Sequence, residues 1–126
     1  MSHITKVKTK LVDLEMLHLA LKDIDCQFEE GDDLKIPEVN GPVLMKLTFA
    51  GMKRHVALVA DSDGSFSIVG DATLIGNLKR DQQIGRLMQR YAYHSVKSTL
   101  LKQGFQLDQE SVGEQSEIRL TLRRTN

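Results

Sequence analysis

The chain has 126 residues, the size of one ordinary domain, and it is long enough to bury a core without disulfides or structural metals. Hydrophobic residues make up 40% and charged residues 27%, and 17 basic side chains balance 17 acidic ones, so the basic excess typical of nucleic-acid binders is missing. A single cysteine, Cys26, excludes an internal disulfide and favours a reducing compartment, the cytoplasm or its equivalent in an organelle. No apolar segment approaches the length of a membrane span, so we expect no membrane association.

The first residues predict a strand followed by a helix. Residues 3–11 alternate, which places three lysines on one face of a half-buried strand: Lys6, Lys8 and Lys10. Asp13 is a favourable N-cap before a run in which leucine and isoleucine recur at helical spacing. We therefore predict a helix over residues 14–23 whose apolar stripe packs on a sheet.

The centre of the chain predicts four strands. Residues 26–30 form a short strand candidate, and the breaker-rich run 31–42 predicts a loop. Alternating segments joined by short turns then predict a three-stranded meander over 43–50, 55–60 and 65–70. Residues 70–80 carry no clear pattern and are expected to link the meander to the next helix.

The last third predicts a long helix and a hairpin. The helix covers about residues 80–103, and Gly104 ends it. Strands over 105–110 and 117–124 follow, with Ile118, Leu120 and Leu122 pointing inward. The order β-α-β-β-β-β-α-β-β predicts a single α+β domain over residues 1–126: a two-layer sandwich with a mostly antiparallel sheet and two helices on one face, close to an elaborated ferredoxin-like plan.

The long helix carries the first candidate site. Four polar-face residues are aligned along it at helical spacing: Arg86, Arg90, Tyr93 and Lys97. Met88, Tyr91, Ala92 and Ser95 are expected on the core side. An exposed aromatic flanked by cations suits an acidic protein partner. The alternative is an ordinary solvated face, in which long basic side chains cover apolar edges.

The outward faces of the first and last predicted strands form a second candidate site. Both are basic, through Lys6, Lys8, Lys10, Arg119 and Arg123, and in a ferredoxin-like order the two strands could be neighbours. Such a face could bind a nucleic acid or a small ligand, or be hidden in a homodimer. The aromatic–glycine pattern of RNA-recognition sheets is missing, so we do not expect a nucleic-acid partner, and the lysines also suit a protected sheet edge.

Signals for catalysis, metals and cofactors are weak. The four histidines and Cys26 show no metal-ligand spacing, and His18, at the margin of the apolar stripe, is expected to be a partly buried structural residue. No phosphate-binding loop, nucleophile elbow or dinucleotide motif is present. Acidic neighbours should raise the pKa of the Cys26 thiol. We expect no enzyme activity, metal or cofactor.

Two segments resemble a known family. The opening "MSHITKVKTKLVDLEMLHLALKDI" and the run "QRYAYHSVKSTLLKQGFQL", together with the final "EIRLTLRR", resemble a small conserved reading-frame family of cyanobacteria and plastids whose function is unknown. The two ends of the chain carry the resemblance, and its centre departs from it. The resemblance implies a cytoplasmic or plastid-stromal accessory or adaptor protein, with AAA-type ATPases as the kind of system it would serve.

Overall fold

The computed structural model describes residues 3–31, 34–36, 39–112 and 118–124. It has an α+β fold, and its elements in chain order are β1 (Ile4–Lys8), α1 (Leu14–Asp23), β2 (Gln27–Glu30), β3 (Met45–Thr48), β4 (Val56–Ala60), β5 (Phe66–Asp71), α2 (Ala72–Arg80), α3 (Gln83–Lys102), β6 (Phe105–Val112) and β7 (Ile118–Arg124). The predicted strands and the two predicted helices are confirmed. That the whole chain is one domain stays a prediction.

Five strands form one antiparallel sheet in the order β1-β5-β4-β3-β2. Short turns join β3, β4 and β5, so the predicted meander is confirmed, and β1 is added at the outer side of β5 with Val7 opposite Ile68. The strand order extends the meander at both sides and does not show a ferredoxin-like topology.

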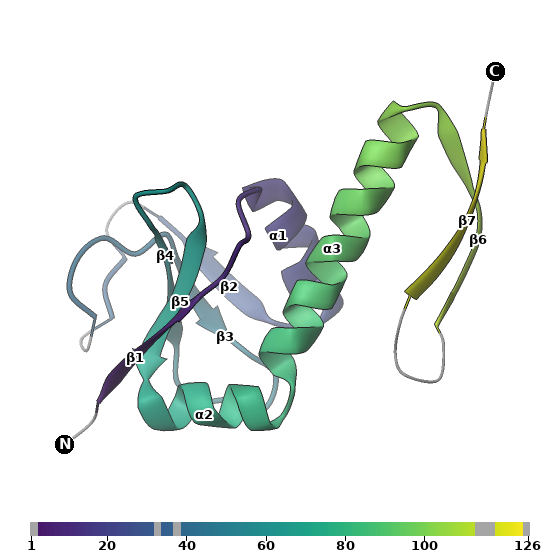
Figure 1. The fold of residues 1–126 in the computed structure, drawn as a ribbon. Coiled ribbons are helices and arrows are strands. Elements are labelled where there is room, and N and C mark those ends of the chain that lie inside the picture. The colour runs from purple at the N-terminus through teal and green to yellow at the C-terminus, as the bar shows by residue number, and fades with distance from the viewer. Residues whose placement is uncertain (1–2, 32–33, 37–38, 113–117, 125–126) are drawn as a thin grey trace.

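Three helices pack together beside this sheet, one more than the sequence predicted. The carboxylate of Asp13 caps α1, accepting hydrogen bonds from the backbone N–H groups of Glu15 and Met16. The 70–80 segment, expected as a linker, forms α2, which Asp71 caps through the N–H of Thr73. Gln82, in the left-handed conformation at φ 58°, separates α2 from α3, so the two helices meet at a corner instead of forming one rod (Figure 1).

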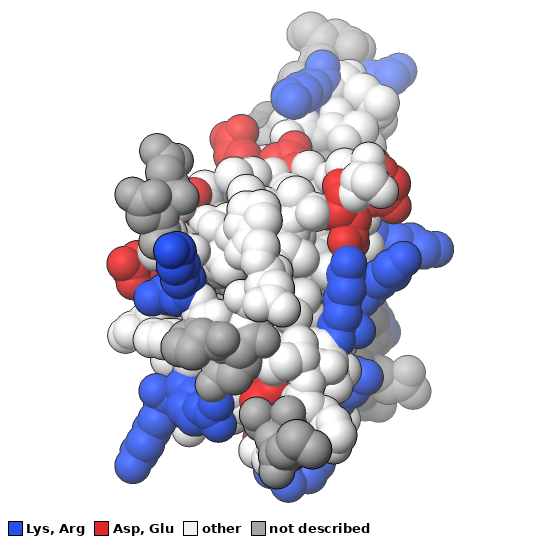
Figure 2. All heavy atoms as spheres, turned by 90° about the vertical axis from the view of Figure 1, so that its left-hand side faces the viewer, with Lys and Arg blue, Asp and Glu red and all other residues white. Residues whose placement is uncertain are grey.

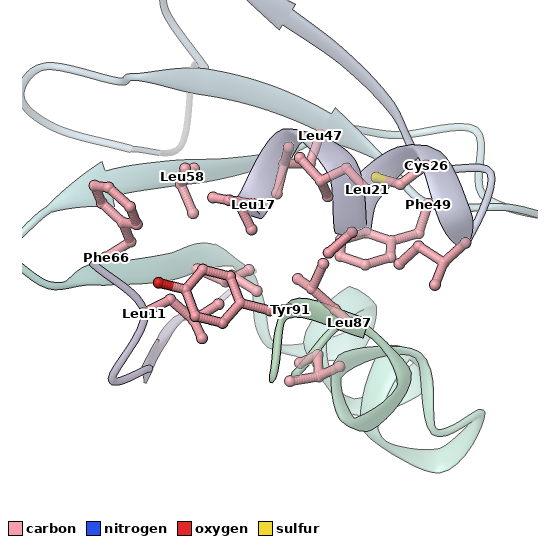
Figure 3. Packing of buried hydrophobic residues seen from close by; sticks show 14 of the residues in the cluster. Leu11, Leu17, Leu21, Cys26, Leu47, Phe49, Leu58, Phe66, Leu87 and Tyr91 are labelled. Carbon is pink, nitrogen blue, oxygen red and sulfur yellow. The ribbon is translucent and has the colours of Figure 1, made fainter. Parts of the chain in front are cut away.

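The main core lies between the helices and one face of the sheet. Leu17 and Leu21 of α1, Leu87 of α3 and Leu47 of β3 are fully buried there. Figure 3 shows these side chains converging with Phe49 and Cys26, and the Tyr91 ring beside Leu11. The apolar stripes therefore pack where their spacing predicts.

The opposite face of the sheet is partly covered by the loop before β3. Ile36 and Val43 of this loop are buried against Ala57 and Val69, and Leu34, Val39 and Val59 join the cluster. The side of the molecule turned to the viewer in Figure 2 shows uncharged atoms in the middle, with Lys and Arg toward the margins. The helix-free face is therefore less open than the sequence suggested, because a chain segment already occupies part of it.

The last two strands form a separate hairpin. Within the described ranges β6 pairs only with β7, with a register shift between Leu107 and Gln109. Figure 1 shows the hairpin beside the C-terminal half of α3, on the side away from the five-stranded sheet. The first and last strands, which a ferredoxin-like order could have made neighbours, belong to different sheets: β1 lies beside β5 in one, and β7 pairs with β6 in the other. The predicted connection between these two strands, residues 111–116, lies largely outside the described residues.

Candidate functional site

The polar stripe of α3 is engaged in contacts within the molecule. The Arg90 Nε donates a hydrogen bond to the Asp23 Oδ2 at the end of α1, at 2.8 Å. Its guanidinium also lies 4.4 Å from the centre of the Tyr93 ring. The Nζ of Lys97 donates to the Tyr93 hydroxyl at 3.2 Å. Arg90 thus joins α3 to α1, and all three side chains have partners within the molecule, so they are less free to bind a protein partner than the sequence suggested.

Tyr93 differs most from its prediction. It was expected on the outer face, but only 8% of it is exposed, and its hydroxyl donates a 2.7 Å hydrogen bond to the Glu110 carboxylate on β6. A phenol that donates to a carboxylate makes one of the stronger hydrogen bonds of a protein. Tyr93 therefore fastens the hairpin to α3.

Asp23 lies at the centre of a charged cluster. Its Oδ2 is also 2.6 Å from the Nε2 of His94, one turn along α3 from Arg90. Partial burial opposes ionisation of Asp23, but the hydrogen bonds and charges of Arg90 and His94 outweigh it and lower the pKa of the carboxyl. The cluster therefore joins α1 to α3 through an ionised carboxylate.

Arg86 is the member of the predicted stripe that remains exposed. It lies at the corner between α2 and α3, where it lines a hollow of about 720 Å³ together with Lys79, Met88 and Gln89. The other three members are differently placed: Arg90 and Lys97 both contact the Tyr93 side chain, and Arg90 and Tyr93 also bond to other elements. The predicted site is thus divided: Arg86 is exposed, whereas Arg90, Tyr93 and Lys97 make contacts within the molecule.

The residues of the predicted basic face lie in two different sheets. Lys6 and Lys8 are on β1, and Lys10 follows it, whereas Arg119 and Arg123 are on β7. Lys6 forms an ion pair with Asp61 at 2.5 Å, and Arg123 donates to the Gln106 side chain at 3.0 Å. Because no common strand pairing unites the five residues, they do not form the single basic sheet face that the sequence suggested.

Two further hollows flank the outward side of α3. One, of about 580 Å³, lies between residues 8–11 and the helix, and the other, of about 320 Å³, lies between the helix and β7. Ala92 and Val96 line both, and Val96 is 49% exposed. Six residues form what we call the α3 strip: Leu11, Met88, Ala92, Val96, Ile118 and Leu120.

The sequence analysis did not predict the α3 strip, although the sequence contains a pattern that indicates it. Ala92 was expected on the core side, but it is exposed, and Ser95 and Met88 are only partly buried. Met88, Ala92 and Val96 recur every four residues, which marks a second apolar line beside the core line of Ile84, Leu87 and Tyr91. Tertiary structure, and not helix periodicity, decides which of two adjacent apolar lines is covered.

His18 and His55 both contact neighbouring side chains. The His18 ring stacks on Phe28, with 5.2 Å between centroids, and its Nε2 lies 3.0 Å from Glu30, although the two atoms are not aligned for a hydrogen bond. His18 is partly buried, as predicted. His55 contacts the Thr48 hydroxyl at 2.7 Å beside a small hollow of about 140 Å³. Thr48, His55 and Glu29 all line this hollow.

Cys26 is buried behind β2, with 4% exposed. Burial raises the pKa of its thiol to about 12, whereas the sequence had pointed to acidic neighbours as the cause. The predicted increase in the thiol pKa is confirmed, but burial causes it and not the acidic neighbours. A thiol held in the neutral form is a poor nucleophile.

The described ranges hold neither a metal-binding cluster nor a membrane-spanning helix. Within them, no group of three or more His, Cys, Asp or Glu side chains is arranged to hold a metal ion. Within the same part of the chain, no helix is both long and apolar enough to span a bilayer.

Comparison with known proteins identifies relatives of this chain. A family model described as "Protein of unknown function (DUF1257)" matches residues 20–121. The chain is 28% identical over 128 residues to the "Uncharacterized protein ycf35" of Pyropia yezoensis, covering 100% of this chain and 99% of the relative. It is 30% identical over 134 residues to the protein of the same description from Guillardia theta, covering 98% of each. No solved structure matches.

Proposed function

The chain belongs to the DUF1257 family of proteins of unknown function, and from its structure we propose that it is a non-enzymatic accessory protein that binds a protein partner through the α3 strip. The observation that carries the proposal is the position of Val96. It is 49% exposed on a long helix, with a hollow on either side. Contiguous apolar surface of this kind on a small protein typically marks a site of interaction.

The geometry of the α3 strip supports a preformed binding groove. Met88, Ala92 and Val96 lie on successive turns and cover about 12 Å of helix. Residues 8–11 border this line on one side, and Ile118 and Leu120 border it on the other. Grooves between packed elements accept an apolar segment without large rearrangement, which lowers the entropic cost of binding.

The scaffold contacts of the polar stripe also support this location. Asp23, Arg90 and His94 fix α3 against α1, and Tyr93 with Glu110 fixes the hairpin against α3. The walls of the groove are thus held by hydrogen bonds and ion pairs beside it. Arg90, Tyr93 and Lys97 are accordingly proposed to support the binding surface, and Arg86 to lie at its border.

Photo-crosslinking tests the proposal. A photoreactive residue is placed at position 96, or at position 19 as a control, since Leu19 is an exposed leucine on α1 and is 38% exposed. We expect position 96, and not position 19, to crosslink one defined protein in extracts of the native host. Val96→Glu should prevent recovery of this protein, while Leu19→Glu leaves it unchanged.

Equal crosslinking from both positions, or undiminished recovery with Val96→Glu, would contradict the proposal. Circular dichroism and the thermal transition of each variant show that it is folded, so that a lost partner reports on the surface and not on the fold.

The basic-face alternative has less support. Lys6 and Arg123 already have partners within the molecule, and the residues belong to two sheets. Labelled single-stranded RNA that binds the wild type with strong salt dependence, and is lost on Lys8→Glu, would favour a nucleic-acid module instead.

A further inference from the structure

The three hollows around α3 share residues and form one connected surface. Met88 lines both the corner hollow and the hollow at residues 8–11, and Gln89 lines both the corner hollow and the hollow at β7. Four cations line this surface: Lys8, Lys10, Lys79 and Arg86. Among the described residues that line the three hollows there is no aspartate or glutamate.

The basic lining of these hollows contrasts with the balanced charge of the whole chain. The whole sequence holds 17 basic and 17 acidic side chains, so hollows whose charged lining residues, among those described, are all basic are a local feature and not a reflection of composition. The four cations are exposed, and within the described part of the chain none of them forms an ion pair, although the charge of Lys8 acts on Asp61 at longer range. Their charges are therefore available to an incoming ligand.

We infer that the α3 strip receives an acidic amphipathic helix of a partner protein. The inference rests on the proposed function and specifies the chemistry of the partner. Apolar side chains spaced along one face of the incoming helix would lie over Met88, Ala92 and Val96. Carboxylates on its flanks would face Lys8 and Lys10 on one side and Lys79 and Arg86 toward the corner. Charges at the border of a groove set specificity and association rate, while the apolar strip supplies the affinity.

Two other occupants fit the surface less well. The strip itself has no aromatic residue, and the two tyrosines that line its hollows, Tyr91 and Tyr93, are only 9% and 8% exposed, so nucleic-acid bases have no open ring there on which to stack. A symmetric dimer through this surface would bring the same four cations of two copies together, and like charges across an interface oppose association.

Peptide binding to the full chain tests the inference. The probe is a fluorescent helical peptide of about 18 residues with leucines at helical spacing and glutamates at the flanking positions. The matched control peptide has lysine in place of every glutamate. We expect the acidic peptide to bind, measured by fluorescence anisotropy, with an affinity that falls as salt is raised, and the basic peptide not to bind.

Charge-reversal variants locate the site. Lys8→Glu with Lys10→Glu should weaken binding of the acidic peptide by about tenfold or more. The matched control is Lys22→Glu with Lys102→Glu, which makes the same change in net charge at exposed lysines that line none of the three hollows. It should leave the affinity within about twofold, because screened charges at a distance contribute little. Val96→Glu should abolish binding.

Any other outcome contradicts the acidic helix as the occupant. Most of these outcomes still show whether the α3 strip binds a protein partner. If both peptides bind equally, the α3 strip is a binding surface but its occupant need not be acidic. If neither binds while position 96 still crosslinks a protein partner, the acidic helix is ruled out and the binding surface is kept. Single-stranded RNA that displaces the acidic peptide would instead identify a polyanion site. A dimer detected by light scattering and abolished by Val96→Glu would show that a second copy occupies the strip. No crosslinking and no peptide binding would overturn both proposals.

Discussion

The hydroxyl oxygen of Tyr91 accepts a hydrogen bond from the backbone N–H of Asp13 at 2.9 Å, and a second one from the N–H of Val12 at 3.2 Å. The phenol thus satisfies backbone groups just before α1, while the carboxylate of Asp13 caps the first turn. Together these contacts join the start of α1 to the middle of α3.

Replacing either tyrosine with phenylalanine should have different effects. Tyr91→Phe leaves two partly buried N–H groups without their acceptor, so we expect it to lower the free energy of unfolding of the whole fold by about 1–2 kcal/mol. Tyr93→Phe removes the bond to Glu110 and should act on the hairpin alone. Chemical denaturation measures the first effect, and amide hydrogen exchange of β6 and β7 measures the second. Faster exchange of α1 in Tyr93→Phe, with an unchanged hairpin, would contradict the assigned role.

Asp23 should make the stability of the chain depend on acid. Its folded-state pKa is lower than its ordinary value of 3.8, so its contribution is complete above that value and is lost as the pH falls through the lowered pKa. Asp23→Asn should therefore reduce the free energy of unfolding at neutral pH by about 0.5–1 kcal/mol, a small effect because the cluster is partly exposed to solvent. The difference from wild type should shrink below about pH 4, as measured by urea denaturation across pH. A difference that stays constant would show that the ion pair contributes nothing.

Cys26 should be protected from alkylation. The pKa of about 12, against 9.0 for a free thiol, implies about a thousandfold less thiolate in the folded chain, and burial also blocks access. Iodoacetamide should label the chain quickly in denaturant and very slowly in buffer, as followed by mass spectrometry. Labelling at similar rates in both conditions would mean that α1 and β2 open readily.

Gly70 should not tolerate a side chain while Val56 is present. A Cβ at position 70 would meet the Val56 Cγ1 at 2.8 Å and its Cβ at 3.2 Å, so β4 and β5 would have to move apart. We expect Gly70→Ala to cost about 1–3 kcal/mol of stability. Val56→Ala removes the 2.8 Å contact and keeps the 3.2 Å one, so in that background the added cost should be smaller, which a double-mutant cycle measures. Full additivity of the two substitutions would rule out this contact as the cause.

The sequence predicts those parts of the fold whose patterns are local. Asp13 before a leucine stripe marks α1, and alternation with a glycine turn marks β4 and β5. The burial of Tyr93 could not be predicted in this way, because its partner Glu110 belongs to another element and a helical projection counts neighbours on one helix only. For the same reason Val96 could not be identified as exposed: it is apolar, and only the placement of β1 and β7 leaves it uncovered. The covering of the sheet by Ile36 and Val43 likewise depends on how a loop folds back.

The pairing of β1 with β5 has a consequence for how the molecule assembles. Thr9 donates to the carbonyl oxygen of Phe66, 57 positions later, whereas β3, β4 and β5 are joined by short turns. Closing a long loop costs chain entropy before any contact repays it, so local pairings form earlier. We expect the meander to fold first and to serve as the template for β1, which pulse-labelling hydrogen exchange can follow. A segment that leaves the ribosome before the meander would then take its place after it.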